Sequence, residues 1–162
     1  SECRARALGL QDLLPETAPK PPPLASTEMC ALVARTGRFL IVRRGEGGLW
    51  AGFWEFPTAH VSGANPAGRS TAAGPEGLAD EVLRQTGVRA KVGPVVRSIT
   101  YGVTKHRVRL DAHEAQGLTD EVAPGAGVRE VAWARPEDLI QYTFSAASRR
   151  LIAGLAGRPP VA

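Results

Sequence analysis

The sequence predicts an α+β sandwich preceded by an extended, proline-rich linker. Three observations support this fold class. Short apolar runs typical of strands recur between residues 29 and 133. Two segments, 75–87 and 145–157, carry apolar residues at helical spacing. Prolines gather at positions 15, 19, 21, 22 and 23, where they favour extended, semi-rigid backbone. Strands and helices mixed in this way are typical of an α+β domain.

The composition bounds the class of protein. The 162 residues are close to one domain, at roughly 150 residues each, and 43% are hydrophobic, enough for a core. The apolar stretches are far shorter than the ~18 residues of a membrane helix, and no secretory signal opens the chain. Two cysteines, Cys3 and Cys30, cannot form a disulfide framework, which favours a reducing compartment. The net charge of +4 tolerates a polyanionic partner without requiring one.

The chain divides into two parts. Residues 1–28 are predicted to be an interdomain linker, because a segment of this composition usually joins two folded bodies. We therefore expect a further folded domain before it. Residues 29–162 are predicted to form the domain itself.

The first half of the domain begins with a hairpin. Residues 29–34 and 39–42 are apolar runs separated by Thr36-Gly37, a pair that suits a tight turn. The aromatic-rich segment 48–57 follows, and residues 60–74 are predicted to be an irregular loop. A helix should then begin near Pro75 and end at Gly87, which suits a left-handed cap. Its buried face is predicted to consist of Leu78, Val82 and Leu83.

The second half alternates strands and loops before a last helix. Residues 92–99 are predicted to be a strand interrupted by Gly93-Pro94. Residues 103–113 alternate, with Val108, Leu110 and Ala112 facing one way. After a loop over 118–127, residues 128–133 form a further strand. Ser145 is a plausible N-cap for the last helix, with Gly157 ending it. Its buried stripe is Ala147, Leu151, Ile152 and Leu155.

The first helix resembles part of the signature of the Nudix hydrolases, G-x5-E-x7-R-E-U-x-E-E-x-G-U, where U is apolar. Residues 80–88 align with its last nine positions, and Glu81, Val82, Gly87 and Val88 match. The resemblance implies a Nudix-like α/β/α sandwich with a mixed sheet. The two glutamates that hold Mg²⁺ in that family fall on Arg84 and Gln85, and a guanidinium repels the cation. An unrelated amphipathic helix ending in glycine is the alternative.

A second resemblance covers nearly the whole chain. The segment LIVRRGEGGLWAGFWEFP (residues 40–57) resembles the start of the C-terminal domain of adenine DNA glycosylases, the MutY family. Residues 130–139 and 144–151 resemble later parts of that domain, and Cys3 with residues 14–21 resembles the stretch that leads into it. The aromatic residues of the segment are expected to pack the core.

This resemblance implies a set of site residues. Cys3 would be the fourth ligand of a [4Fe–4S] cluster in a full-length parent, and this chain alone would bind no cofactor. Catalytic residues are not expected here. The resemblance implies that Val103, Thr104 and Lys105 contact the lesion. Positive charge adds further DNA-contacting residues: Arg107 and Arg109 on the same strand face as Lys105, and Arg43 and Arg44 as second contributors. Val103 and Lys105 depart from the Phe and His of the family, and the charged face could alternatively be merely solvated.

The leading expectation is therefore a DNA base excision repair domain that recognises 8-oxoguanine opposite adenine, within a glycosylase that removes the adenine. The chain alone should be inactive, monomeric and cytoplasmic (nucleoid-associated, nuclear or mitochondrial, depending on the organism). Its partners would be double-stranded DNA and a glycosylase domain in cis, with no membrane. The alternative is a free-standing Nudix-type nucleoside diphosphate hydrolase with rearranged metal ligands. A third possibility is an interaction module whose proline-rich leader binds a repair partner.

Overall fold

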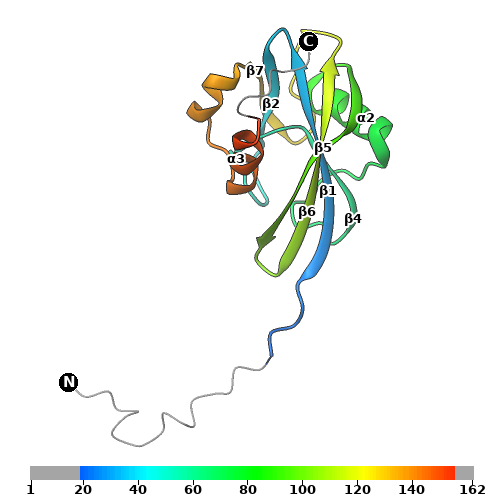
Figure 1. Ribbon diagram of the computed structural model, residues 1–162, viewed down its shortest axis with the longest axis vertical. Helices are drawn as coiled ribbons and strands as arrows, with labels where there is room; N and C mark the ends of the chain where they lie inside the picture. The colour runs from blue at the N-terminus through cyan, green and yellow to red at the C-terminus, as the bar shows by residue number, and fades with distance from the viewer. Residues whose placement is uncertain (1–18, 156–162) are drawn as a thin grey trace, which may run out of the picture.

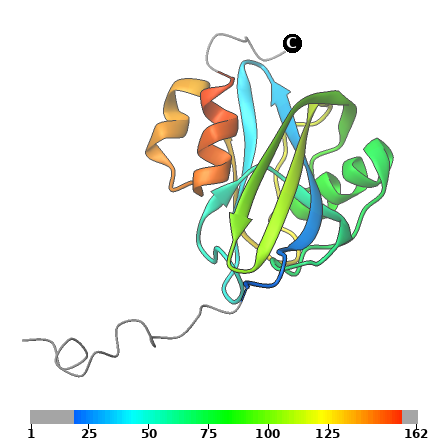
Figure 2. The same cartoon turned by 60° about the horizontal axis from the view of Figure 1, so that its bottom comes forward.

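A computed structural model describes residues 19–155 and has a mixed β-sheet between two helical layers (Figure 1). Helix α2 (Gly74–Thr86) covers one face. Helix α3 (Ala146–Ala153) and the 3₁₀ helix η2 (Pro136–Gln141) cover the other, as the second view makes plain (Figure 2). The predicted α+β sandwich is confirmed. None of the helices within residues 19–155 is long and apolar enough to cross a membrane.

Strand β1 (Leu24–Arg35) is the centre of the sheet. It pairs in parallel with β6 (His106–Gly117) along one edge. Along the other edge it pairs antiparallel with β4 (Thr58–Gly63) and β2 (Arg38–Arg44). This strand begins five residues before Met29, where the sequence places the start of the domain. The hairpin predicted at Thr36-Gly37 is confirmed, because Arg35 pairs with Arg38 across it.

The remaining strands extend the sheet to both sides. The short β3 (Trp54–Glu55) and β7 (Val128–Ala134) both pair antiparallel with β2. On the far side β5 (Ala90–Val103) pairs antiparallel with β6. The register of that pair shifts between Val92 and Val95, next to the predicted interruption. Residues 60–63, predicted as loop, belong to β4 instead, because their backbone pairs with the start of β1.

The segment 103–113 is not the single strand that its alternation predicts. The chain reverses at Thr104 and Lys105, where β5 ends and β6 begins, and Thr104 takes a positive φ of 50°. Val108, Leu110 and Ala112 are buried as expected. The prediction failed because the alternation of residue types continues through the turn.

The two predicted helices form. In α2, Leu78 and Val82 are fully buried, but Leu83 is 43% exposed and does not belong to the buried face. Gly87 caps this helix with a φ of 72°, which a residue with a Cβ rarely adopts. In α3, Ser145 accepts a hydrogen bond from the Ser148 N–H at 3.2 Å, as predicted for an N-cap. That helix ends at Ala153, earlier than predicted.

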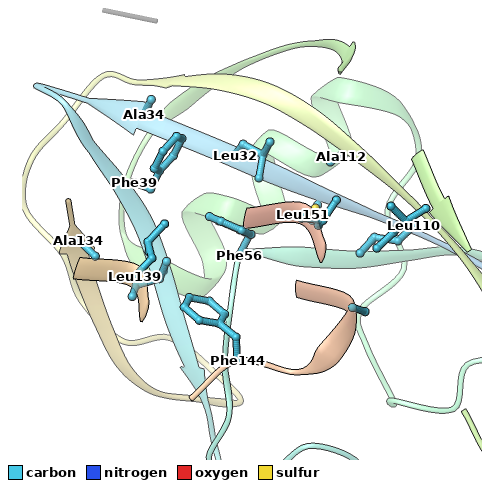
Figure 3. Packing of buried hydrophobic residues seen from close by; sticks show 14 residues of the cluster. Leu32, Ala34, Phe39, Phe56, Leu110, Ala112, Ala134, Leu139, Phe144 and Leu151 are labelled. Atoms are coloured by element: carbon cyan, nitrogen blue, oxygen red, sulfur yellow. The ribbon is translucent and has the colours of Figure 1, made fainter. Parts of the chain in front are cut away.

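Each face of the sheet carries its own core. On the α3 side, the close-up shows residues converging from the strands, η2 and α3 (Figure 3). Phe56 lies at its centre, with its ring centroid 6.1 Å from those of Phe39 and Phe144. Core packing by the aromatic segment is confirmed for Phe56 and for Trp54, which packs against the cluster, but Trp50 and Phe53 do not belong to it. On the α2 side, the core is built from Met29, Ala31, Val33, Leu40, Ala59, Leu78, Val82, Val88 and Ala115.

Candidate functional site

A cavity of about 250 Å³ opens beside the C-terminal half of α2. Strands β2 to β4 form one wall, and the segments 68–70 and 126–128 form the others. Its lining is polar in character, with charged side chains contributed by several elements. The lining residues are Val42, Arg44, Glu55, Thr58, Gly68, Arg69, Ser70, Glu81, Arg84, Gln85, Ala126, Gly127 and Val128.

The inner wall of the cavity is a buried ion-pair network. Arg69, with a side chain only 6% exposed, donates to both carboxylate oxygens of Glu55, at 2.6 and 2.8 Å. Arg44 reaches the same carboxylate at 3.4 Å and donates to the Ala67 carbonyl at 2.9 Å. Burial by itself would raise the pKa of the Glu55 carboxyl. The charge and hydrogen bonds of Arg69, helped by Arg44, outweigh burial and lower that pKa below its usual 4.5.

A second carboxylate supports Arg69 from behind. Glu28 on β1 is 1% exposed, and its Oε1 lies 3.3 Å from the Arg69 Nε. Tyr101 on β5 donates its hydroxyl to Glu28 Oε2 at 3.3 Å. Burial, with the nearby Glu28 charge, raises the pKa of Tyr101 and keeps its proton in place. The contact between Arg69 Nε and Glu28 is an ion pair without a hydrogen bond, so the position of Arg69 is fixed mainly by its two hydrogen bonds to Glu55.

The outer wall carries a different pair, within α2. The Glu81 carboxylate accepts from Arg84 Nε at 2.7 Å and from Arg84 Nη2 at 2.5 Å. Gln85 Nε2 also donates to Glu81, at 2.6 Å, and to the Thr58 carbonyl at 3.0 Å. These two bonds fix the orientation of the amide, which leaves Gln85 Oε1 buried without a hydrogen-bond partner among the described residues. Residues three and four apart lie on one helix face, which explains the cluster.

The third wall is joined to α2 through the backbone. The N–H groups of Ala123 and Gly125 donate to the carbonyls of Thr86 and Gln85, at 2.8 and 2.9 Å. Gly125 lies so close that a Cβ there would be 1.8 Å from the Arg84 carbonyl oxygen. This close approach requires glycine and places residues 126–128 beside the charged side chains of α2.

The residues present do not form a site for a divalent cation. Among residues 19–155 there is no group of three or more His, Cys, Asp or Glu side chains that could hold a metal ion. The two carboxylates that face the cavity, Glu55 and Glu81, are each bound by a guanidinium at two points. Mg²⁺ needs several anionic or carbonyl oxygens in near-octahedral order. Whether the chain binds a divalent cation stays a prediction.

The structure separates the predicted contact residues into two places. Val103, Thr104, Lys105, Arg107 and Arg109 lie along the turn and strand of the β5–β6 hairpin. Arg109 pairs there with Asp111 at 3.0 Å, and the Thr104 hydroxyl lies 3.2 Å from His106 Nδ1. Lesion contact by these residues stays a prediction.

The other two predicted cations lie on β2 and have protein partners. Arg43 donates to Glu130 at 2.7 Å and to the Gly52 carbonyl at 3.0 Å. Arg44 lines the cavity instead of joining the hairpin residues. Cys3 and most of the linker lie outside the described residues, and Cys30 is buried with a thiol pKa raised by burial.

Three residues of the network, Glu28, Glu55 and Arg69, were not predicted as site residues. One signal was available for two of them: Glu28 and Glu55 are charged residues within otherwise apolar segments. A carboxylate in such a position is buried and needs a partner. The partner itself, Arg69, lies in a polar segment and gives no such signal.

Comparison with known proteins agrees with the fold. The family model described as a NUDIX domain matches residues 28–154. A MutT protein from Methanosarcina mazei Go1 is similar, at 24% identity and a TM-score of 0.64, covering 82% of this chain and 92% of its own. A MutT NUDIX hydrolase from Burkholderia pseudomallei has 16% identity and a TM-score of 0.64, covering 80% and 96%. The comparison with curated proteins gave no match.

A further similar structure is the NUDIX domain of Shewanella oneidensis NrtR, complexed with ADP ribose. It has 13% identity and a TM-score of 0.60, and the match covers 97% of this chain and 99% of the other. These matches correct the leading expectation from the sequence. The matched chains are Nudix proteins, and the matches cover nearly their whole length. The interpretation as a repair domain of an adenine DNA glycosylase, with an iron–sulfur parent, was wrong, and the findings favour the alternative Nudix-type interpretation.

Proposed function

Because this chain belongs to the Nudix family, we propose that it binds nucleoside diphosphate compounds, with the diphosphate in the cavity beside α2. The observation that carries the proposal is the position of Arg84. Its side chain is 41% exposed and reaches the cavity lining from the last turn of the helix. A guanidinium can bind a phosphate through two parallel hydrogen bonds.

The cavity is large enough for the diphosphate but not for the whole ligand. Whole small-molecule ligands usually occupy about 300–1,000 Å³. A cavity of about 250 Å³ fits a diphosphate, with the nucleoside lying outside it. Thr58 and Ser70 add polar groups to the lining, and the buried Gln85 Oε1 would accept a hydrogen bond from a ligand hydroxyl.

Arg84 is the cation that a ligand can reach most easily. Arg69 contacts two carboxylates and is nearly inaccessible, so that moving it would leave buried charges unpaired. Arg84 is 41% exposed, whereas its partner Glu81 is 6% exposed and needs the guanidinium. A phosphate can therefore contact Arg84 from the solvent side while Glu81 keeps its hydrogen bonds. The ADP ribose bound by the NrtR domain on a similar fold is the compound we would test first.

Titration calorimetry with ADP-ribose tests this proposal. The intact chain should bind ADP-ribose and not adenosine, which lacks the diphosphate. Arg84→Ala should weaken binding about tenfold or more, because a charge-assisted hydrogen bond contributes about 1.5–3 kcal/mol. The matched control is Arg149→Ala, an exposed arginine on α3 at the opposite face of the sheet. Equal weakening by both variants, or no binding by the intact chain, would refute the assignment of the cavity.

Hydrolysis of the bound diphosphate is a second candidate function, favoured by one observation. Glu55 and Glu81 face the same cavity and are the carboxylates nearest to where a diphosphate would lie. Release of a nucleoside monophosphate from ADP-ribose or 8-oxo-dGTP, dependent on added Mg²⁺ and lost in Glu81→Gln, would support it. Because both carboxylates are paired with arginines, we derive no hydrolytic step from this arrangement.

The resemblance of residues 40–57 to the MutY family remains a proposal about descent alone. We infer that the segment marks a common origin within Nudix-type domains, and that it was kept because Phe56 and Trp54 pack in or against the core.

A further inference from the structure

Around Glu81, side-chain donors occupy the place that a cation bound to this carboxylate would take. Glu81 matches a glutamate of the Nudix signature, and the next two signature glutamates are replaced by Arg84 and Gln85. Both of these replacements point back at Glu81. Arg84 contacts its two oxygens at 2.7 and 2.5 Å, and Gln85 contacts one of them at 2.6 Å. Two positions that supply cation ligands in the family instead supply donors here.

The Arg84 guanidinium also neutralises the negative charge of Glu81, as a bound cation would. Glu81 is 6% exposed on its side chain, and an unpaired carboxylate at that depth would be costly. The hydrogen bond and charge of Glu81 raise the pKa of Arg84, which favours the charged form of the guanidinium. A divalent cation would have to displace Arg84 and then lie close to a displaced positive charge.

Glu55, the second carboxylate of the cavity, does not provide another binding site for a cation. Glu55 accepts from Arg69 with both oxygens, and Arg44 approaches at 3.4 Å. Arg69 in turn is fixed by Glu28 at 3.3 Å. A cation at Glu55 would face two buried guanidinium groups, and the other carboxylate in the lining, Glu81, is already paired with Arg84.

We propose that the guanidinium of Arg84 takes the place of a divalent cation at Glu81, so that the cavity receives its diphosphate ligand without any divalent cation. The second half of this statement rests on the proposed function. The first half concerns the chain alone: the protein carries its own fixed positive charge where its relatives' signature would recruit one.

The first experiment uses the cation alone. Mn²⁺ is titrated into the intact chain, Arg84→Gln and the double variant Arg84→Glu/Gln85→Glu, with free Mn²⁺ followed by electron paramagnetic resonance. The double variant should bind one Mn²⁺ per chain, and the intact chain should bind none over the range that saturates the variant. Binding to the intact chain that is lost in Glu81→Gln would overturn the proposal. So would a folded double variant that binds no Mn²⁺.

A thermal melt with and without Mn²⁺ covers the case in which the double variant folds poorly. Its melting temperature should rise with Mn²⁺, while that of the intact chain stays constant. If the double variant does not fold at all, Arg84→Gln replaces it. This variant removes the fixed charge and should bind Mn²⁺ more tightly than the intact chain, and equal binding by the two would overturn the proposal.

The second experiment uses ADP-ribose, titrated into the intact chain in EDTA and again in excess Mg²⁺. The dissociation constants should agree within about twofold, because no cation takes part. Binding that needs Mg²⁺ would overturn the second half of the proposal. If ADP-ribose binds in neither buffer, the proposed function fails, while the Mn²⁺ titration still decides whether Arg84 replaces a cation.

Discussion

Two carboxylate–guanidinium pairs face the same cavity, and they differ mainly in depth. Glu55 and Arg69 have side chains 12% and 6% exposed, whereas Arg84, the partner of Glu81, is 41% exposed. The inner pair joins β3 to the segment before α2, and the outer pair lies within one turn of the helix. The same chemical pair therefore serves two purposes: Arg69 is buried and fixes the wall, whereas Arg84 is accessible and can contact a ligand while Glu81 remains buried beneath it.

The difference follows from desolvation. Removing one member of a buried pair leaves an uncompensated charge and costs about 3–5 kcal/mol, whereas exposed pairs contribute about 0–1 kcal/mol. The inner pair should thus report on folding and the outer pair on binding. The experiments below test that division, beginning with the largest effect.

Replacement of Arg69 should have the largest effect on stability. Arg69→Met leaves Glu28 buried without a cation and Glu55 with only the more distant Arg44, and we expect a loss of about 3–5 kcal/mol in the free energy of unfolding. Urea unfolding measures this, with the exposed Arg149→Met as the matched control. A loss below about 1 kcal/mol would show that water reaches the inner pair and that depth does not separate the two pairs.

Acid should act on the inner pair next. The pKa of Glu55 is lowered in the folded protein, so its contribution is complete above its unfolded value near 4.5 and is lost as the pH falls through the lower, folded value. The melting temperature should therefore drop as the pH falls below about 4.5. In Arg69→Met, Arg44 is the remaining cation beside the buried carboxyl, so the folded pKa is lowered less and the drop should be smaller. Coincident pH profiles for the two proteins would contradict this.

Tyr101 provides a smaller test of the same network. Tyr101→Phe removes the donor to Glu28 Oε2, a bond of 3.3 Å to a buried carboxylate. The expected loss is about 1.5 kcal/mol, the lower end for hydrogen bonds to charged groups. Chemical unfolding of this variant beside Tyr142→Phe, whose hydroxyl is outside the network, measures the difference. An equal loss in both would remove Tyr101 from the support of Arg69.

The outer pair should have the smallest effect on stability. Arg84→Ala is expected to lower the free energy of unfolding by about 1 kcal/mol, the lower end for a buried group that loses a partner, because Gln85 still donates to Glu81. The same variant should lose ADP-ribose affinity. Arg35→Ala, which breaks an exposed pair with Asp120 away from the cavity, is the control for both measurements. A stability loss as large as that of Arg69→Met would make Arg84 a structural residue.

Sequence reasoning predicted the parts of the fold that depend on neighbouring residues. The hairpin at Thr36-Gly37, the helix cap at Gly87 and the N-cap at Ser145 all depend on local backbone preferences. The alternation of residue types does not mark the reversal at Thr104 and Lys105, because neither residue is a strong turn former; the family resemblance alone implied a loop between two strands there. Local chemistry fixes such features only where a residue type is specific for them.

The site was predictable to the extent that it lies in one element. Glu81, Arg84 and Gln85 share a helix face, so their spacing alone brought them together. Glu28, Glu55 and Arg69 come from β1, β3 and the segment before α2, and their meeting depends on sheet pairing that no local pattern encodes. The aromatic segment correctly predicted core packing for Phe56 and Trp54, but its resemblance misled the functional interpretation, because packing residues report descent and not chemistry.

The close contact between Gly125 and the end of α2 has a consequence for how this cavity can vary. Two main-chain hydrogen bonds and a glycine without room for a methyl group set the spacing between helix and loop. Substitutions at positions 126–128 can therefore change which ligands the cavity prefers, while the distance between α2 and the loop stays the same.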